Sequence, residues 1–271
     1  MTYDDADLRR IQLVQLDLLK EVDRICKKCG IRYNIIAGTL LGAVRHGGFI
    51  PWDDDADVAM LRREYDRFVL ACQKELNTDK YYFQDHHVTP GYRWGYGKLR
   101  RRDSLFLREH QEHMPYEQGI FIDIFPLDCV PNDQPGRTWK SFECFLVRKA
   151  LYSPVGKVAS KDLLSRMVYS LLSRIPEKTV LKKLDSLIER AGRKETDHVR
   201  ILMFPTPNKQ YSYLKRWYEK SDDILFEGIP FPGISDYDEY LTFKFGNYHE
   251  LPPEGQRKKH PVSALKIPEE I

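Results

Sequence analysis

The stretch "GGFIPWDDDADVAM", residues 47–60, places four aspartates within five positions, directly before an apolar run. In an extended chain the side chains alternate, so Asp53, Asp55 and Asp57 share one face. Carboxylates that converge beside a core are pushed toward protonation unless a cation compensates their charge. Oxygen ligands of this kind select Mg²⁺ or Mn²⁺. The aspartates therefore predict a divalent-metal site, and a solvated acidic turn after Pro51 is the alternative.

A lone carboxylate in a second stretch strengthens the metal hypothesis. In "GIFIDIFPLD", Asp123 is the only ionisable residue of a predicted strand, Ile120 to Phe125, that is apolar on both faces. Burying such a group costs several kcal/mol unless it is paired or bound to metal. We therefore expect Asp123 to be a further metal ligand or a general base. A buried salt bridge to an arginine or a lysine is the alternative.

A glycine and a hydroxyl residue upstream of the aspartates offer a place for phosphate. "AGTLLGAVRHGG" follows a predicted strand and opens a helix, so Gly38 and Thr39 lie at a helix N-terminus. Free backbone N–H groups and the helix dipole favour anions at that position. The pair carries little weight alone. Followed by an aspartate-bearing strand, it predicts a phosphate cradle beside the metal.

Aromatic and cationic residues alternate in "GYRWGYGKLRRRDS", residues 91–104. If this stretch is extended, Trp94, Tyr96, Lys98 and Arg100 share one face. Lys98 and Arg100 would then grip a phosphate, and Trp94 and Tyr96 would hold a quaternary ammonium group by cation–π contact. Packing of the two rings against a helix is the alternative.

A sheet must bring these residues together, and the sequence predicts a mixed α+β chain with a mostly helical middle section. Hydrophobic periodicity and glycine positions predict helices over residues 7–29, 39–48, 63–76 and 161–191. Short strands are expected at residues 31–38, 55–60, 81–88, 93–102 and 119–128. We expect residues 1–150 to form the catalytic core. Residues 151–271 would be a helical section and an irregular C-terminal segment packed on that core, with one continuous domain as the alternative.

Composition limits the classes of function. The chain of 271 residues has a net charge of only +3, which gives no argument for nucleic acid as a partner. Its five cysteines are an odd set without a disulfide pattern, which favours a reducing compartment such as the cytoplasm. No apolar run reaches the length of a membrane span, and the N-terminus lacks the apolar stretch of a signal peptide.

Residues 161–191 form a cationic amphipathic segment with an apolar stripe at helical spacing. Packing of this stripe on the catalytic core is the simpler expectation. Peripheral contact with an anionic membrane, at the inner face, is the alternative. The stripe consists of Leu163, Leu164, Met167, Val168, Leu171, Leu172 and Ile175.

"IIAGTLLGAVRHGGFIPWDDDADVAM" together with "GIFIDIFPLD" resembles the LicD family of phosphocholine transferases, which is related to the fukutin-type phosphoribitol transferases. The resemblance covers about residues 31–128, and it implies a nucleotidyltransferase-like mixed β-sheet core flanked by helices. It places the aspartate motif of the family on Asp53, Asp55 and Asp57, and the glycine–hydroxyl turn on Gly38 and Thr39. "FGNYHELPPEGQRKKHP" near the C-terminus is also similar to the family, less distinctively.

The resemblance implies a reaction. A phosphocholine or related phospho-alcohol moves from CDP-choline, or another CDP-alcohol, to a hydroxyl of a glycan acceptor, and CMP is released. The acceptor would be a cell-surface glycan precursor, such as a lipid-linked teichoic acid or lipopolysaccharide precursor. Asp55 and Asp57 would hold Mg²⁺ or Mn²⁺, and Asp123 would take the proton of the acceptor hydroxyl.

Two other classes of function stay open. A conventional nucleotidyltransferase would use the same metal residues but transfer NMP and release pyrophosphate. A non-catalytic, glycan-binding member of the fold would bind no metal, and the intact aspartate set argues against it. Formation of CMP rather than pyrophosphate would distinguish the phosphocholine transferase from the conventional nucleotidyltransferase. Binding of Mg²⁺ or Mn²⁺ in a titration would distinguish it from the non-catalytic protein.

Overall fold

The computed structural model describes residues 3–206, 208–257 and 259–270, and it confirms an α+β fold. The helices of the described chain are α1 (Asp5–Cys29), α2 (Ala37–His46), α3 (Arg62–Glu75), α4 (Gln134–Ala159), α5 (Leu163–Leu172), α6 (Glu177–Gly192) and α7 (Tyr237–Phe245). The strands are β1 (Asn34–Ile35), β2 (Asp57–Leu61), β3 (Tyr81–Gln84), β4 (Gly97–Arg101), β5 (Leu105–Arg108), β6 (Phe121–Val130), β7 (His198–Arg200), β8 (Tyr213–Leu214), β9 (Ser221–Phe226), β10 (Ile229–Ile234) and β11 (Val262–Lys266). Two short 3₁₀ helices cover Lys215–Tyr218 and Glu254–Gln256.

Helix α1 forms where the sequence predicts it. Asp4 caps its start by accepting a hydrogen bond from the Asp7 N–H at 2.8 Å. Gly30 ends it with a φ of 61°, a left-handed conformation that glycine adopts without steric cost. Most of the apolar side chains between these ends are buried, and α1 packs with α3 against the sheet.

The central sheet is mixed. In the described chain it has the order β3-β4-β6-β2-β1-β10-β9, and β7 and β8 extend it from β6. Strands β2 and β6 run parallel, as do β1 and β10, and the other neighbours are antiparallel. The register places Asp57 of β2, Asp123 of β6, Lys98 of β4 and Gln84 of β3 in one row across four strands. This row brings together residues that lie up to 66 positions apart in the sequence.

Three predicted strands are shorter in the structure. Strand β4 begins at Gly97 rather than at residue 93, because Gly95 has a φ of 58° that no regular strand accommodates. Strand β1 has two residues, because α2 already begins at Ala37. Strand β3 ends at Gln84, and residues 85–88 form a turn.

The C-terminal segment differs most from the expectation. We expected it to be irregular, yet residues 198–266 contribute five strands and α7. Strand β10 pairs with β1 and, with β9, completes one side of the central sheet, and β11 pairs with β5 in a separate two-stranded sheet. The prolines that obscured the pattern include Pro230 and Pro232, which alternate along β10. The expected division at residue 150 falls inside α4.

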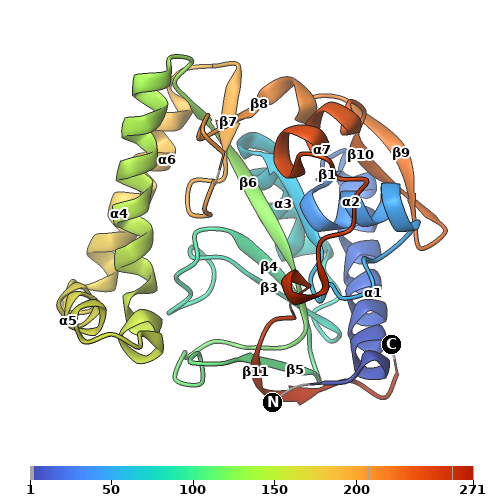
Figure 1. Ribbon diagram of the computed structural model, residues 1–271, viewed down its shortest axis with the longest axis horizontal. Helices are drawn as coiled ribbons and strands as arrows, with labels where there is room; N and C mark the ends of the chain where they lie inside the picture. Colours follow the sequence, from blue (N-terminus) through green and yellow to red (C-terminus); the bar gives the residue numbers. More distant parts are fainter. Residues whose placement is uncertain (1–2, 207, 258, 271) are drawn as a thin grey trace.

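The middle section is helical, as predicted. Helices α4, α5 and α6 form a layer beside β6, on the left in Figure 1. We call residues 134–192 the helical unit. Its α5 buries Tyr169, whereas Leu163 and Leu164 are each 72% exposed and the rest of the predicted stripe is at most partly covered. The expectation that this stripe packs on the core is therefore wrong. Within the described residues, no helix combines the length and hydrophobicity needed to cross a membrane.

Candidate active site

The aspartate turn joins α2 to β2, and only Asp57 lies within the strand. Helix α1 holds the backbone of the turn through two buried glutamines. The Gln12 side chain donates to the Asp53 carbonyl at 2.9 Å, and the Gln15 side chain donates to the Asp54 carbonyl at 2.7 Å. These bonds satisfy backbone acceptors that a buried turn would otherwise leave unpaired. The turn is thus a fixed element rather than a solvated loop.

Asp54 anchors the turn to both ends of the chain. Its carboxylate accepts hydrogen bonds from the Tyr3 hydroxyl and from the His260 N–H at 2.6 Å, and it lies 2.6 Å from His260 Nδ1. Its side chain is 1% exposed. Burial would raise the pKa of Asp54, but the bonds to His260 and Tyr3 outweigh it and the pKa is lowered. Asp54 therefore stays ionised and holds the turn in place.

The other carboxylates repel one another. The pKa of Asp57 lies well above its ordinary value, because of burial first and then the charges of Asp55, Asp123 and Asp53. The pKa of Asp53 is raised strongly and that of Asp55 is raised, in both cases first by burial. Such a set of crowded oxygens fits the donor preference of Mg²⁺ or Mn²⁺, because a divalent cation would remove the repulsion.

The candidate ligand atoms of the aspartates are not all equally close to one another. In the described part of the chain, Asp55 forms a group with Asp54 and His260 in which one ligand atom of each lies within 4.8 Å of the others. Neither Asp57 nor Asp123 belongs to that group. Metal binding by Asp53, Asp55, Asp57 and Asp123 therefore stays a prediction, supported by their electrostatics.

Asp123 has a partner in the sheet. Its carboxylate forms an ion pair with the ammonium group of Lys98, and the two side chains are 9% and 5% exposed. The sequence left a buried salt bridge to an arginine or lysine as the alternative for Asp123, and the structure shows that bridge, with Lys98. The pKa of Lys98 is lowered to about 8, because burial outweighs the attraction of Asp123. The Lys98 ammonium also lies 3.4 Å from the centre of the Phe121 ring.

The glycine–hydroxyl turn lies at the N-terminus of α2, as predicted. The Thr39 hydroxyl oxygen is buried and accepts the Asp57 N–H at 2.8 Å, so it fixes the start of β2. A Cβ on Gly38 would lie 2.6 Å from an Asp53 carboxylate oxygen, so only glycine lets this carboxylate approach the helix. The structure thus gives both residues a role in placing aspartates. Phosphate binding by Gly38 and Thr39 stays a prediction.

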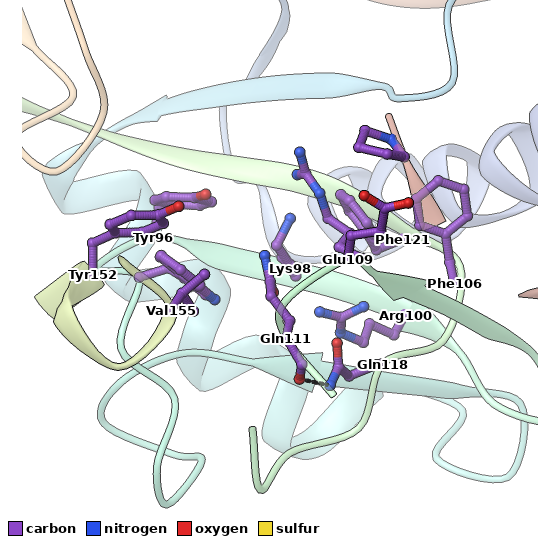
Figure 2. Close-up of a pocket in the computed structure, with 13 residues that line it drawn as sticks. Tyr96, Lys98, Arg100, Phe106, Glu109, Gln111, Gln118, Phe121, Tyr152 and Val155 are labelled. Atoms are coloured by element: carbon purple, nitrogen blue, oxygen red, sulfur yellow. Dashed lines mark hydrogen bonds between the residues drawn. The ribbon is translucent and has the colours of Figure 1, made fainter. Parts of the chain in front are cut away.

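A cavity of about 250 Å³ lies beside Lys98, and the four predicted residues Trp94, Tyr96, Lys98 and Arg100 all line it (Figure 2). They do so although residues 92–96 are not in a strand. Three of the lining residues are cationic and one, Glu109, is acidic. The remaining lining residues are Phe106, Arg108, Gln111, Gln118, Phe121, Tyr152, Val155 and Pro261.

The cavity pairs cations with aromatic rings. Arg100 is held by hydrogen bonds from its Nε to Gln84 at 2.6 Å and from its Nη1 to the Gly119 carbonyl at 2.7 Å. Trp94 is held by a bond from its Nε1 to the Tyr116 hydroxyl at 2.8 Å. Figure 2 shows Tyr96 and Tyr152 toward one end of the cavity and Lys98 between them and Arg100. A phosphate group and a quaternary ammonium group would fit at neighbouring positions in this cavity.

Sequence reasoning missed several residues of this site. Tyr3 and His260, which bind Asp54, carry no local signal that relates them to the aspartates. Tyr152 and Val155 of α4 reach the cavity from the helical unit. The C-terminal stretch that contains His260 was similar to the family, which was the one available indication.

The mixed sheet and the acidic site agree with the family that the sequence resembles. Comparisons with known proteins support the same family. The family described as "LicD/FKTN/FKRP, nucleotidyltransferase domain" matches residues 30–163. The lipopolysaccharide cholinephosphotransferase LicD of Haemophilus influenzae is 30% identical over 266 residues, which cover 96% of this chain and 98% of that protein. The chain therefore belongs to the LicD family, and it is a phosphotransferase.

Two shorter matches concern part of the chain. An uncharacterized protein of Rickettsia typhi is 37% identical over 70 residues, which cover 24% of this chain and 23% of that protein. An uncharacterized protein of Rickettsia prowazekii is 47% identical over 62 residues, or 23% of each chain. Neither name adds information on function.

Proposed function

We propose that this protein transfers phosphocholine from CDP-choline to a hydroxyl of a lipopolysaccharide precursor and releases CMP. The observation that carries the proposal is the cavity beside Lys98, which combines Trp94, Tyr96 and Tyr152 with three cations. Phosphocholine joins a quaternary ammonium group to a phosphate, and these two groups need aromatic rings and cations at neighbouring positions. The Haemophilus influenzae relative, a lipopolysaccharide cholinephosphotransferase, supports both donor headgroup and acceptor.

The residues of the site divide the work. Asp55 and Asp57, with Asp53 beside them, would hold Mg²⁺ or Mn²⁺, which neutralises diphosphate charge when bound. Arg100, fixed by Gln84 and Gly119, offers a preorganised cation to the phosphate that is transferred. Asp123 accepts the proton of the acceptor hydroxyl. The Lys98 ammonium group keeps Asp123 oriented and adds positive charge at the wall of the cavity.

The helical unit gives the protein a surface for the membrane that carries a lipid-linked acceptor. Residues 134–192 contain twelve lysines and arginines and five aspartates and glutamates, a net charge of +7, although the whole chain has only +3. Large apolar side chains of α4 and α5 are exposed among these charges. An apolar groove of about 470 Å³ runs between α4, the end of α5 and α6. A cationic, apolar helical surface binds anionic bilayers.

The membrane face is proposed to be the cytoplasmic one. The five cysteines of the chain are all free, as expected in a reducing compartment. The protein would therefore work as a peripheral protein at the inner face. Tyr152 and Val155 connect the exposed surface of the helical unit to the cavity beside Lys98, because they belong to α4 and also line that cavity.

The test is a donor panel. The purified chain is incubated with Mg²⁺, a lipopolysaccharide acceptor and, in turn, CDP-choline, CDP-ethanolamine, CDP-glycerol or CDP-ribitol. We expect CMP and labelled acceptor with CDP-choline, and no pyrophosphate. A matched Trp94→Leu variant should lose the preference for CDP-choline over CDP-ethanolamine, because the ring no longer holds the trimethylammonium group. Equal use of all four donors by the wild type would contradict the headgroup assignment, and pyrophosphate would contradict the reaction.

A further inference from the structure

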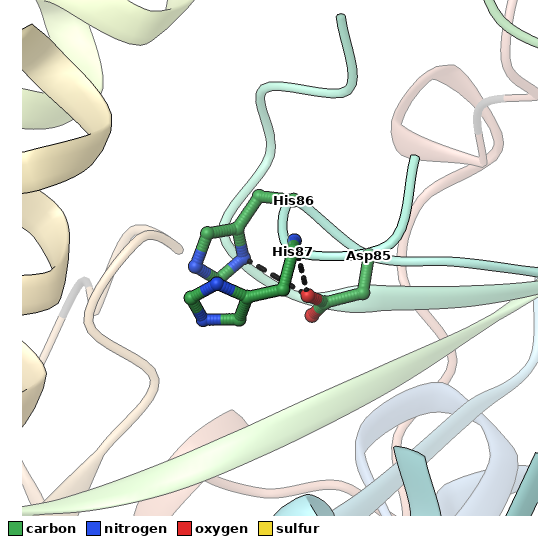
Figure 3. Close-up of side chains that lie close together, drawn as sticks. All are labelled: Asp85, His86 and His87. Atoms are coloured by element: carbon green, nitrogen blue, oxygen red, sulfur yellow. Dashed lines mark hydrogen bonds and ion pairs between the residues drawn. The ribbon is translucent and has the colours of Figure 1, made fainter. Parts of the chain in front are cut away.

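A second cluster of metal-ligating side chains lies outside the candidate active site. Asp85, His86 and His87 follow β3 directly, and one ligand atom of each lies within 4.8 Å of the others. Figure 3 shows the two imidazole rings side by side with the Asp85 carboxylate next to them, and the ring centres are 3.9 Å apart. Asp185 of α6 approaches the same two rings from the helical unit.

The cluster contains buried polar atoms without hydrogen bonds. The His86 side chain is 2% exposed, yet neither of its ring nitrogens has a hydrogen-bond partner in the described chain. The Asp185 Oδ1 atom is also buried and unpaired. Asp85 faces one of these atoms, His86 Nδ1, at 3.4 Å. His86 Nε2 and Asp185 Oδ1 are the two buried atoms that require an explanation, and an ion bound between them would pair both.

The two distances from Asp185 to the imidazole nitrogens are close to those of a tetrahedral metal site. Asp185 Oδ1 lies 3.6 Å from His86 Nε2 and 3.7 Å from His87 Nε2. Ligands bound at about 2.0–2.2 Å in a tetrahedral zinc site lie roughly 3.3–3.6 Å from one another. Two imidazoles and one carboxylate are a donor set that zinc accepts. His87 and Asp185 are 56% and 41% exposed, so water can reach a fourth position.

The other nitrogen of His86 has the neighbour that a metal-bound histidine needs. Asp85 Oδ1 lies 3.4 Å from His86 Nδ1. Asp85 is itself fixed, because it accepts the His87 N–H at 2.8 Å and a hydrogen bond from the Tyr65 hydroxyl. A carboxylate at this place holds the Nδ1–H of a histidine and leaves Nε2 free for the metal.

We propose that His86 Nε2, His87 Nε2 and Asp185 Oδ1 bind a Zn²⁺ ion, with Asp85 orienting His86. The ion joins the edge of the sheet after β3 to α6, so it fixes the helical unit relative to the catalytic core. It is separate from the predicted Mg²⁺ site, whose aspartates come from the turn before β2, from the start of β2 and from β6. The role is structural, and it does not depend on which substrate the enzyme uses.

The test measures zinc binding and melting temperature rather than activity. The full chain is stripped of metal and titrated with ZnCl₂ against a chromophoric chelator, and Co²⁺ serves as a probe of tetrahedral geometry by its visible absorption. We expect the wild type to bind one zinc ion per chain at this site and to melt at a higher temperature with zinc. His87→Ala and Asp185→Ala should weaken this binding by at least roughly 100-fold, more than the loss of an outer partner does. Both side chains are partly exposed, so these variants should fold.

Two controls make the assignment specific. His113→Ala changes an exposed histidine and should bind zinc as the wild type does. His260→Ala removes the histidine of the other acidic group and should keep the tetrahedral Co²⁺ spectrum. The proposal is overturned if the wild type binds no zinc at micromolar concentration, if His87→Ala and Asp185→Ala both bind like the wild type, or if only His260→Ala loses the ion.

Discussion

The exposed leucines of α5 allow a quantitative test of membrane contact. Leu163 and Leu164 are each 72% exposed, and burying a whole leucine side chain contributes about 1.5–3 kcal/mol. Insertion of both side chains into a bilayer should therefore contribute about 2–4 kcal/mol. The double variant Leu163→Ser, Leu164→Ser should lower the partition coefficient roughly 30- to 1000-fold. Its folding should change little, because these positions have few neighbours to lose.

The assay is co-sedimentation with vesicles of phosphatidylcholine mixed with phosphatidylglycerol. The matched control is Leu225→Ser, since Leu225 is 60% exposed but lies on β9, at the opposite end of the sheet from the helical unit (Figure 1). It should bind like the wild type. Omitting phosphatidylglycerol or raising the salt concentration should weaken wild-type binding, because the net charge of +7 on residues 134–192 attracts anionic lipid. Wild-type binding by the double variant, or an equal loss in Leu225→Ser, would refute the reasoning.

Further predictions concern the candidate active site. Asp57→Asn should abolish turnover while the metal-free melting temperature stays equal or rises, because one of the mutually repelling carboxylates is gone; wild-type turnover at saturating Mg²⁺ would exclude Asp57 as a ligand. The raised pKa values of Asp53 and Asp57 mean that the folded state holds protons that the unfolded state has released, so their contribution to stability falls as pH rises above about 4. Mg²⁺ should therefore raise the melting temperature more at about pH 8 than at about pH 5.5, and an equal shift would contradict this. Asp123→Asn should lower the free energy of unfolding in urea by about 3–5 kcal/mol, because it leaves the buried Lys98 charge without its partner. The double variant with Lys98→Met should recover most of this loss, and strictly additive losses would contradict the pairing. Gly38→Val should displace the Asp53 carboxylate, which lies 2.6 Å from the new Cβ, and lower turnover with a smaller effect on melting; unchanged turnover would show that Asp53 is dispensable.

Much of the site could be predicted where the signal is local. The spacing of Asp53, Asp55 and Asp57, the presence of a short helix just upstream of them and the burial of Asp123 in β6 each follow from a few neighbouring residues, although α2 begins two residues earlier than predicted. Trp94, Tyr96, Lys98 and Arg100 do share a cavity, although the chain before Gly97 is not a strand. Alternation gave the correct grouping because each of these side chains is two positions from the next.

The rest depends on contacts that periodicity does not encode. The partner of Asp123 follows from the register of β4 against β6, and nothing within either strand specifies that register. The partners of Asp54 lie 51 and 206 positions away. The stripe of α5 shows that one face is apolar, but whether the core or solvent covers this face depends on where the helical unit packs. For this reason the expectation that the stripe of α5 packs on the catalytic core was wrong.

The fixing of Asp54 by Tyr3 and His260 has a consequence for biosynthesis. The aspartate turn leaves the ribosome well before its anchor His260, which lies 206 positions after Asp54, and β10 must also arrive before β1 has both neighbours. Contacts of such large sequence separation form late and slowly in folding. A nascent chain that contains Asp123 but not yet His260 would therefore hold every predicted catalytic aspartate and still lack a fixed turn. Synthesis of the segment that carries β10 and His260 would act as a quality check on this phosphotransferase, since the acidic site becomes ordered only when that segment is present.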